Sequence, residues 1–117
     1  MSFSKQFSIK EDVLIVRLGG ELDHHEADQL KTEWHHMLHL HEIKHTIVNL
    51  QSVTFMDSSG IGVILGRYKE VVQLGGELIV CSVPTSIQKI FLMSGIYKII
   101  RQEASEEYAL HSLGVAS

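Results

Sequence analysis

Short apolar runs alternate with segments of helical periodicity along this chain, and that alternation constrains its fold more than any other feature. Strand-like apolar runs lie at 13–18, 45–50 and 78–81. In the segments that follow these runs, apolar residues recur at steps of three and four, which is the spacing of one helix face. Strands that alternate with helices predict an α/β fold with a mixed, mainly parallel sheet and right-handed crossovers.

The N-terminal part of the chain departs from this alternation. Residues 7–9 alternate apolar and polar side chains, and the polar residues 10–12 suit a tight connection to the strand at 13–18. We therefore expect an antiparallel hairpin at the N-terminus. Gly19-Gly20 is expected to break the second strand of that hairpin. The predicted element order is β-β-α-β-α-β-α-β-α.

Capping residues mark the expected helix ends. Asp23, with Glu26 three residues on, resembles a capping box that opens the first helix. Pro84 suits the first turn of a later helix, and Gly95 suits its C-terminal stop. Helices are expected to cover one face of the sheet more fully than the other.

The last part of the chain is expected to complete the sheet. Residues 97–100 could form a short edge strand, and Ser105 could cap a last helix that ends at Gly114. A length of 117 residues suits one core, so residues 1–117 are predicted to form a single domain.

Composition excludes several classes of function. A formal net charge of -4 and the lack of a long Lys/Arg cluster argue against nucleic-acid binding. The longest apolar runs are too short to span a bilayer, and residues 1–6 lack the layout of a signal peptide. Cys81 is the single cysteine, so a reducing cytoplasm fits best.

The segment Asp57-Ser58-Ser59-Gly60 carries the strongest functional signal. It lies between the strand-like run at 45–50 and an apolar-periodic helix, so both serines sit where free N–H groups and the positive dipole end are near. A hydroxyl at that place can be a helix cap, a nucleophile or a phosphate acceptor. A nucleophile is disfavoured because the chain has no Gly-x-Ser-x-Gly elbow and chain order assigns no histidine as its base.

The helix after Ser58 has two contrasting faces. A projection at 100° steps places the expected core stripe at Ile61, Ile64, Leu65, Tyr68 and Val72. The opposite side then holds Ser59, Gly62, Val63, Gly66, Arg67 and Glu70. Glycine inside a helix costs about 1 kcal/mol relative to alanine, and these two glycines point away from the expected core. This favours an exposed docking surface, although packing under an N-terminal loop would also explain the glycines.

The chain contains eight histidines. His35 and His39 are four residues apart on one helix, which is the spacing of some metal-binding pairs. No cysteine or carboxylate stands at a convincing spacing to be a third ligand. We therefore expect no metal site and no cofactor, and we expect His25 and His36 to be solvated.

The segment from Phe55 to Lys69 closely resembles the signature of the anti-anti-sigma factor (STAS) family. Residues 20–25 and 113–117 further resemble the branch of that family that acts on sigma-F in sporulating bacilli. The resemblance covers essentially the whole chain, and it implies a STAS-like fold.

The resemblance implies a non-enzymatic regulator that works by partner switching. The unphosphorylated form would bind an anti-sigma factor that is also a serine kinase, and so release sigma-F to activate sporulation transcription. That kinase, which binds ATP or ADP, would use ATP to phosphorylate Ser58, and a PP2C-type phosphatase would reverse the step. An antagonist or scaffold of another, stress-response sigma pathway is the alternative, with a serine hydrolase less favoured.

The same resemblance implies roles for single residues. Asp57, Ser59 and Gly60 would form the motif around the phosphate acceptor. The residues that would contribute to kinase docking are Asp23, His24, Gly62, Val63, Gly66 and Arg67.

Overall fold

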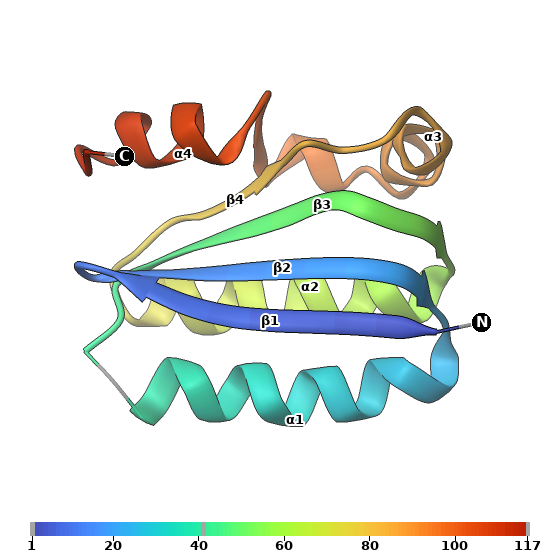
Figure 1. Ribbon diagram of the computed structural model, residues 1–117, viewed down its shortest axis with the longest axis horizontal. Helices are drawn as coiled ribbons and strands as arrows, with labels where there is room; N and C mark the ends of the chain where they lie inside the picture. Colours follow the sequence, from blue (N-terminus) through green and yellow to red (C-terminus); the bar gives the residue numbers. More distant parts are fainter. Residues whose placement is uncertain (1, 41, 117) are drawn as a thin grey trace.

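The computed structural model describes residues 2–40 and 42–116, which form one five-stranded sheet flanked by helices (Figure 1). The strands lie side by side in chain order, β1-β2-β3-β4-β5. The first pair is antiparallel, and each later pair is parallel. Their bounds are β1 Phe3–Lys10, β2 Val13–Leu22, β3 His45–Met56, β4 Leu78–Cys81 and β5 Arg101–Glu103.

Helices follow each of the strands from β2 onward. They are α1 His24–Leu40, α2 Ser58–Gln73, α3 Thr85–Ser94 and α4 Glu106–Ser112, with a short 3-10 helix η1 at Ile96–Lys98. The predicted α/β class, the hairpin and the mixed, mainly parallel sheet are thus confirmed. No helix in the described part of the chain combines the length and apolar character needed to cross a bilayer.

The two faces of the sheet bury different amounts of apolar surface. Alternate residues of one strand point to opposite faces, so Leu14 and Val16 join the larger core while Val13 and Ile15 join the smaller one. The larger core is completed by α1, α2 and α3, and the smaller one by Ala109, Leu110 and Val115 around α4. The expectation that helices cover one face more fully is confirmed.

The glycine pair in β2 does not end that strand, contrary to the prediction. β2 continues to Leu22, and its register against β3 shifts on both sides of this pair. Gly20 has a positive φ of 81°, and a Cβ there would lie 2.0 Å from the carbonyl oxygen of Ser2. The glycines therefore allow a bulge and a close approach of β1 within a continuous strand.

The edge strand expected at 97–100 is also misplaced. Gly95 adopts the left-handed conformation and ends α3 as predicted, but a 3-10 helix follows and the edge strand is β5 at Arg101–Glu103. Ile96 and Ile100 are both buried and stand four residues apart. That is helical spacing, and it indicates a helical turn rather than a strand.

Candidate functional site

Asp57 caps helix α2, which leaves Ser58 outside the capping interaction. The Asp57 side chain accepts a hydrogen bond from the Ser59 backbone N–H at 2.9 Å, and its backbone carbonyl accepts from the Gly60 N–H at 3.1 Å. Ser58 is the first residue of α2, and it is exposed. The cap of α2 is therefore Asp57, and neither serine of the pair has that role.

Gly60 allows the turn into α2 to pack closely on the sheet. A Cβ at this position would lie 2.5 Å from Cγ of Met56 and 3.0 Å from Cδ2 of Leu22. Both neighbours are buried at the ends of β3 and β2. The absence of a side chain at Gly60 therefore fixes how near the serine pair lies to the sheet edge.

The start of α1 lies beside the start of α2. β2 and β3 are parallel, so the two helices that follow them begin at the same edge of the sheet (Figure 1). His24 Nδ1 lies 3.2 Å from the Ser59 hydroxyl, and Asp23 caps α1 by accepting from the Glu26 N–H at 3.0 Å. The structure thus brings the Asp23-His24 loop together with the serine pair.

A shallow groove of about 290 Å³ runs between α1 and α2 from this point. A Cβ added at Gly62 or Gly66 meets nothing within 4 Å, so both glycines face open space. No described segment at the N-terminus packs on them, which excludes the alternative that they lie under a loop. The groove is lined by His24, Ala27, Asp28, Lys31, Ser59, Gly62, Val63, Gly66 and Arg67.

A second hollow, of about 410 Å³, lies on the other side of Ser58. It separates α2 from α3 and is lined mainly by apolar groups, among them Ile61, Ile90 and Met93, with Lys89 at its edge. The sequence analysis missed this surface. The local pattern could not reveal it, because Met93 is left 78% exposed by the way α3 packs in the folded chain.

Comparison with known proteins agrees with this geometry. The STAS domain family profile matches residues 4–109. The chain is 45% identical to an anti-sigma F factor antagonist of Paenibacillus polymyxa, with 90% of each chain covered. It belongs to the STAS family of anti-sigma factor antagonists.

Solved structures of the family bear the same fold. The anti-sigma factor antagonist SpoIIAA in its unphosphorylated form matches with a TM-score of 0.83 at 28% identity, covering 97% of this chain and 100% of that one. The phosphorylated form of the Bacillus cell fate determinant SpoIIAA matches with a TM-score of 0.75 at 30% identity, covering 94% and 99%. The resemblance seen in the sequence is confirmed.

The two faces assigned to α2 in this STAS domain need correction. Val63 and Arg67 are only 7% and 8% exposed, whereas Val72, expected in the core, is 49% exposed. The physical reason is that α2 packs against α1 as well as the sheet, so its buried stripe is wider and turned toward α1. Gly62 remains exposed as predicted.

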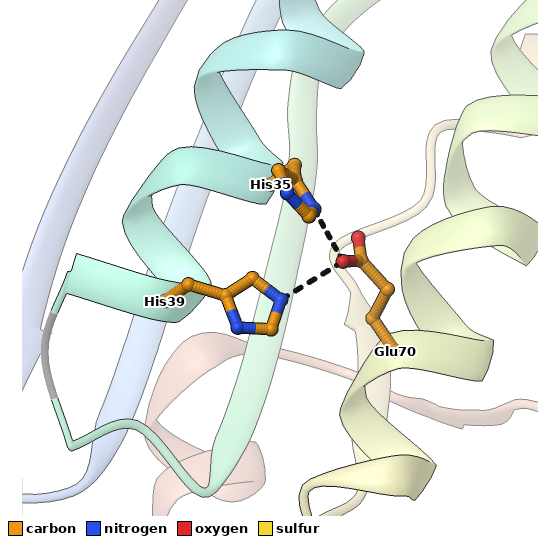
Figure 2. Close-up of side chains that lie close together, drawn as sticks. All are labelled: His35, His39 and Glu70. Atoms are coloured by element: carbon orange, nitrogen blue, oxygen red, sulfur yellow. Dashed lines mark hydrogen bonds and ion pairs between the residues drawn. The ribbon is translucent and has the colours of Figure 1, made fainter.

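The histidine pair has a third potential ligand that the sequence did not reveal. Glu70 on α2 lies against His35 and His39 on α1, with its Oε2 atom 3.0 Å from His39 Nε2 (Figure 2). Glu70 stands 31 residues from His39, so local spacing could not predict the contact. Partial burial acts to raise the pKa of Glu70, but hydrogen bonds to His39 and His35 and the charge of Arg67 outweigh it and lower that pKa.

Cys81 is part of the smaller core, as the apolar strand around it predicts. Its side chain is buried, and burial raises the pKa of the thiol to about 12. A thiol with so high a pKa is protonated at neutral pH and is a poor nucleophile.

Proposed function

We propose that this chain is a phosphorylation-switched antagonist of an anti-sigma factor, with Ser58 as the phosphate acceptor. The observation that carries the proposal is the position of Ser58. It is exposed at the start of α2, between the α1–α2 groove and the α2–α3 hollow, while Asp57 does the capping. A kinase can therefore reach the hydroxyl without opening the helix.

The unphosphorylated chain would bind an anti-sigma factor that is also a serine kinase, and binding would release sigma-F for sporulation transcription. The 45% identity to an anti-sigma F factor antagonist supports this branch of the family. The ATP needed for the transfer would belong to the kinase, and a PP2C-type phosphatase would restore Ser58. We place the chain in the cytoplasm, as one domain over residues 1–117 that acts by binding and not by catalysis.

The kinase would dock on the α1–α2 groove. Gly62 and Gly66 have no side chains on the exposed side of α2, so a partner backbone can approach the helix closely. Val63 and Arg67 form the floor of that groove, with His24 at its Ser59 end and Asp23 in the same loop. Ser59 and Gly60 would complete the motif around the phosphate acceptor by fixing the conformation of the turn between β3 and α2.

Phosphorylation would act by charge and size without a change of fold. A phosphoryl group adds about -1.5 to -2 charge at neutral pH, and a helix N-terminus tolerates an anion. A partner that had covered the hydroxyl could not accept that group. A loss of about 4 kcal/mol in binding free energy would weaken the complex roughly a thousandfold.

The acceptor residue can be tested with the sigma-F-type kinase and ATP. We expect one phosphoryl group per chain by intact mass, lost in Ser58→Ala and kept in Ser59→Ala. Labelling that persists in Ser58→Ala would overturn the assignment. Binding to a kinase of the stress-response pathway, with none to the sigma-F-type kinase, would keep the switch but move it to the alternative pathway.

The serine hydrolase alternative receives little support. A nucleophilic serine needs a base within hydrogen-bond reach, and His24 lies against Ser59 rather than against Ser58, the serine that a hydrolase would use here. Treatment with an acyl-phosphonate probe should leave the chain unlabelled. Labelling abolished by Ser58→Ala would favour the enzyme.

A further inference from the structure

The C-terminal halves of α1 and α2 carry a cluster of His35, His39 and Glu70, here called the His–Glu cluster. The two imidazoles point from α1 toward one carboxylate oxygen on α2 (Figure 2). Each residue offers one ligand atom, and the three atoms all lie within 4.8 Å of one another. Such convergence from two helices is not needed for the core, because both histidines are exposed.

We propose that the His–Glu cluster binds one divalent transition-metal ion of the zinc class. Two imidazole nitrogens and one carboxylate oxygen are ligands that Zn²⁺ accepts, with a fourth position left for water. Mg²⁺ and Ca²⁺ prefer sites made of oxygen ligands. The chemistry of the donors therefore selects the metal class.

The geometry suits an ion after a small adjustment. Residues at i and i+4 lie on one side of a helix, and the two imidazole rings have centroids 4.7 Å apart. Tetrahedral zinc with bonds of about 2.0–2.2 Å places its ligand atoms about 3.3–3.5 Å apart. The His35 and His39 side chains are 58% and 48% exposed. They can therefore rotate until their nitrogen atoms reach this spacing, and an ion can enter from solvent.

The carboxylate is oriented by a neighbour on its own helix. Arg67 Nε lies 2.5 Å from Glu70 Oε1, which turns the other oxygen, Oε2, toward the histidines. Residues that orient a ligand in this way commonly support metal sites. The Arg67 charge also opposes a cation, so we expect affinity in the micromolar rather than the nanomolar range, about a thousandfold weaker.

A bound ion would clip α1 to α2. The metal site would lie beyond the C-terminal end of the groove. Arg67 contributes to both sites, because it lines the groove and pairs with Glu70. Metal binding to the folded chain alone would raise its thermal stability by mass action. The proposal of a metal site does not rest on the proposed phosphate switch at Ser58.

The test is a titration of ZnCl₂ into the full chain, free of any histidine tag and pretreated with chelator, at pH 7.5. We expect one ion per chain by calorimetry, a rise in melting temperature, and no binding of Mg²⁺ at the same concentration. His35→Ala and His39→Ala should each weaken zinc binding at least tenfold. Glu70→Gln should weaken it too, with circular dichroism showing that the variant folds.

His36→Ala is the matched control, because His36 lies on the same helix but lines a different hollow beside Phe7 and Met37. It should bind zinc as the parent chain does. Zinc affinity that is unchanged in both His35→Ala and His39→Ala would overturn the proposal. A loss of binding in His36→Ala equal to that in His35→Ala would overturn it as well.

Discussion

The two ends of the α1–α2 pair carry opposite chemistry. Both helices run in the same direction from the same edge of the sheet (Figure 1). At their N-terminal ends lie caps and hydroxyls, with His24 near Ser59. At their C-terminal ends lie the His–Glu cluster and Arg67.

Helix direction gives a physical reason for this difference. The N-terminus of a helix favours negative charge and its C-terminus favours positive charge, and two parallel helices add their effects at each end. A phosphoryl group at Ser58 and a cation at the His–Glu cluster would therefore each occupy the end that favours its charge. Two parallel helices packed in this way can prepare two different binding sites.

The largest expected effect comes from adding charge at the N-terminal end. Ser58→Glu should weaken binding to the kinase roughly a thousandfold, since the carboxylate would be buried against the partner, whereas Ser58→Ala should bind normally. Calorimetry of the complex measures both. His111→Glu adds a similar charge at an exposed position of α4 and should leave the affinity for the kinase unchanged. Equal binding by Ser58→Glu and His111→Glu would show that charge at this end does not matter.

The N-terminal end was largely predictable from sequence because its features are local. Asp57 caps α2 by accepting a hydrogen bond from the backbone N–H two residues on. The change from an apolar strand to an apolar-periodic helix indicates where the turn before α2 lies. The sequence predicts β4 at Leu78–Cys81 because four apolar residues in a row indicate a buried strand, and all four are buried. Local hydrogen bonds and runs of apolar residues can be read without knowing the tertiary structure.

The rest depends on how helices pack, which local patterns do not encode. Glu70 reaches the histidines only because α2 lies beside α1. The burial of Val63 and Arg67 has the same origin. A helical projection of α2 alone shows only the face that packs on the sheet, whereas the folded helix also packs on α1. Ser117, in the C-terminal part of the family resemblance, lies outside the described residues.

The next effect tests whether the serine pair depends on close packing at the sheet edge. Gly60→Ala should destabilise the fold by about 1–2 kcal/mol. The new methyl group would clash with the Met56 side chain, and the cost of that clash exceeds the free energy gained from the higher helix propensity of alanine. Urea unfolding measures the change. An unchanged midpoint would mean that Met56 moves aside freely.

A smaller effect of opposite sign is expected farther along the same helix. Gly66→Ala adds a methyl into open space, so it should stabilise the fold by about 0.5–1 kcal/mol. The same variant should weaken kinase binding if the partner backbone approaches α2 there. Unfolding and binding are measured on one sample. Greater stability with unchanged binding would remove Gly66 from the docking surface.

The smallest effect concerns an ion pair on the face of the sheet that α4 covers, away from both ends of the α1–α2 pair. Arg17 donates hydrogen bonds to both carboxylate oxygens of Glu106, at 2.6 and 2.9 Å, and Asn49 donates a third. The Arg17 hydrogen bonds lower the pKa of Glu106 and outweigh the effect of its partial burial. A lowered pKa contributes stability that is present above the unfolded value of about 4.3 and is lost as the pH falls through the folded value.

The sign of that pH dependence can be checked against a variant. The parent chain should lose more stability than Glu106→Gln between about pH 5 and pH 3, by only about 0.2–0.5 kcal/mol since Arg17 is partly exposed. Thermal unfolding in matched salt measures the difference. Identical pH profiles would mean that solvent screens this pair, and that packing around α4, with Ala109 and Leu110, holds the second face without it.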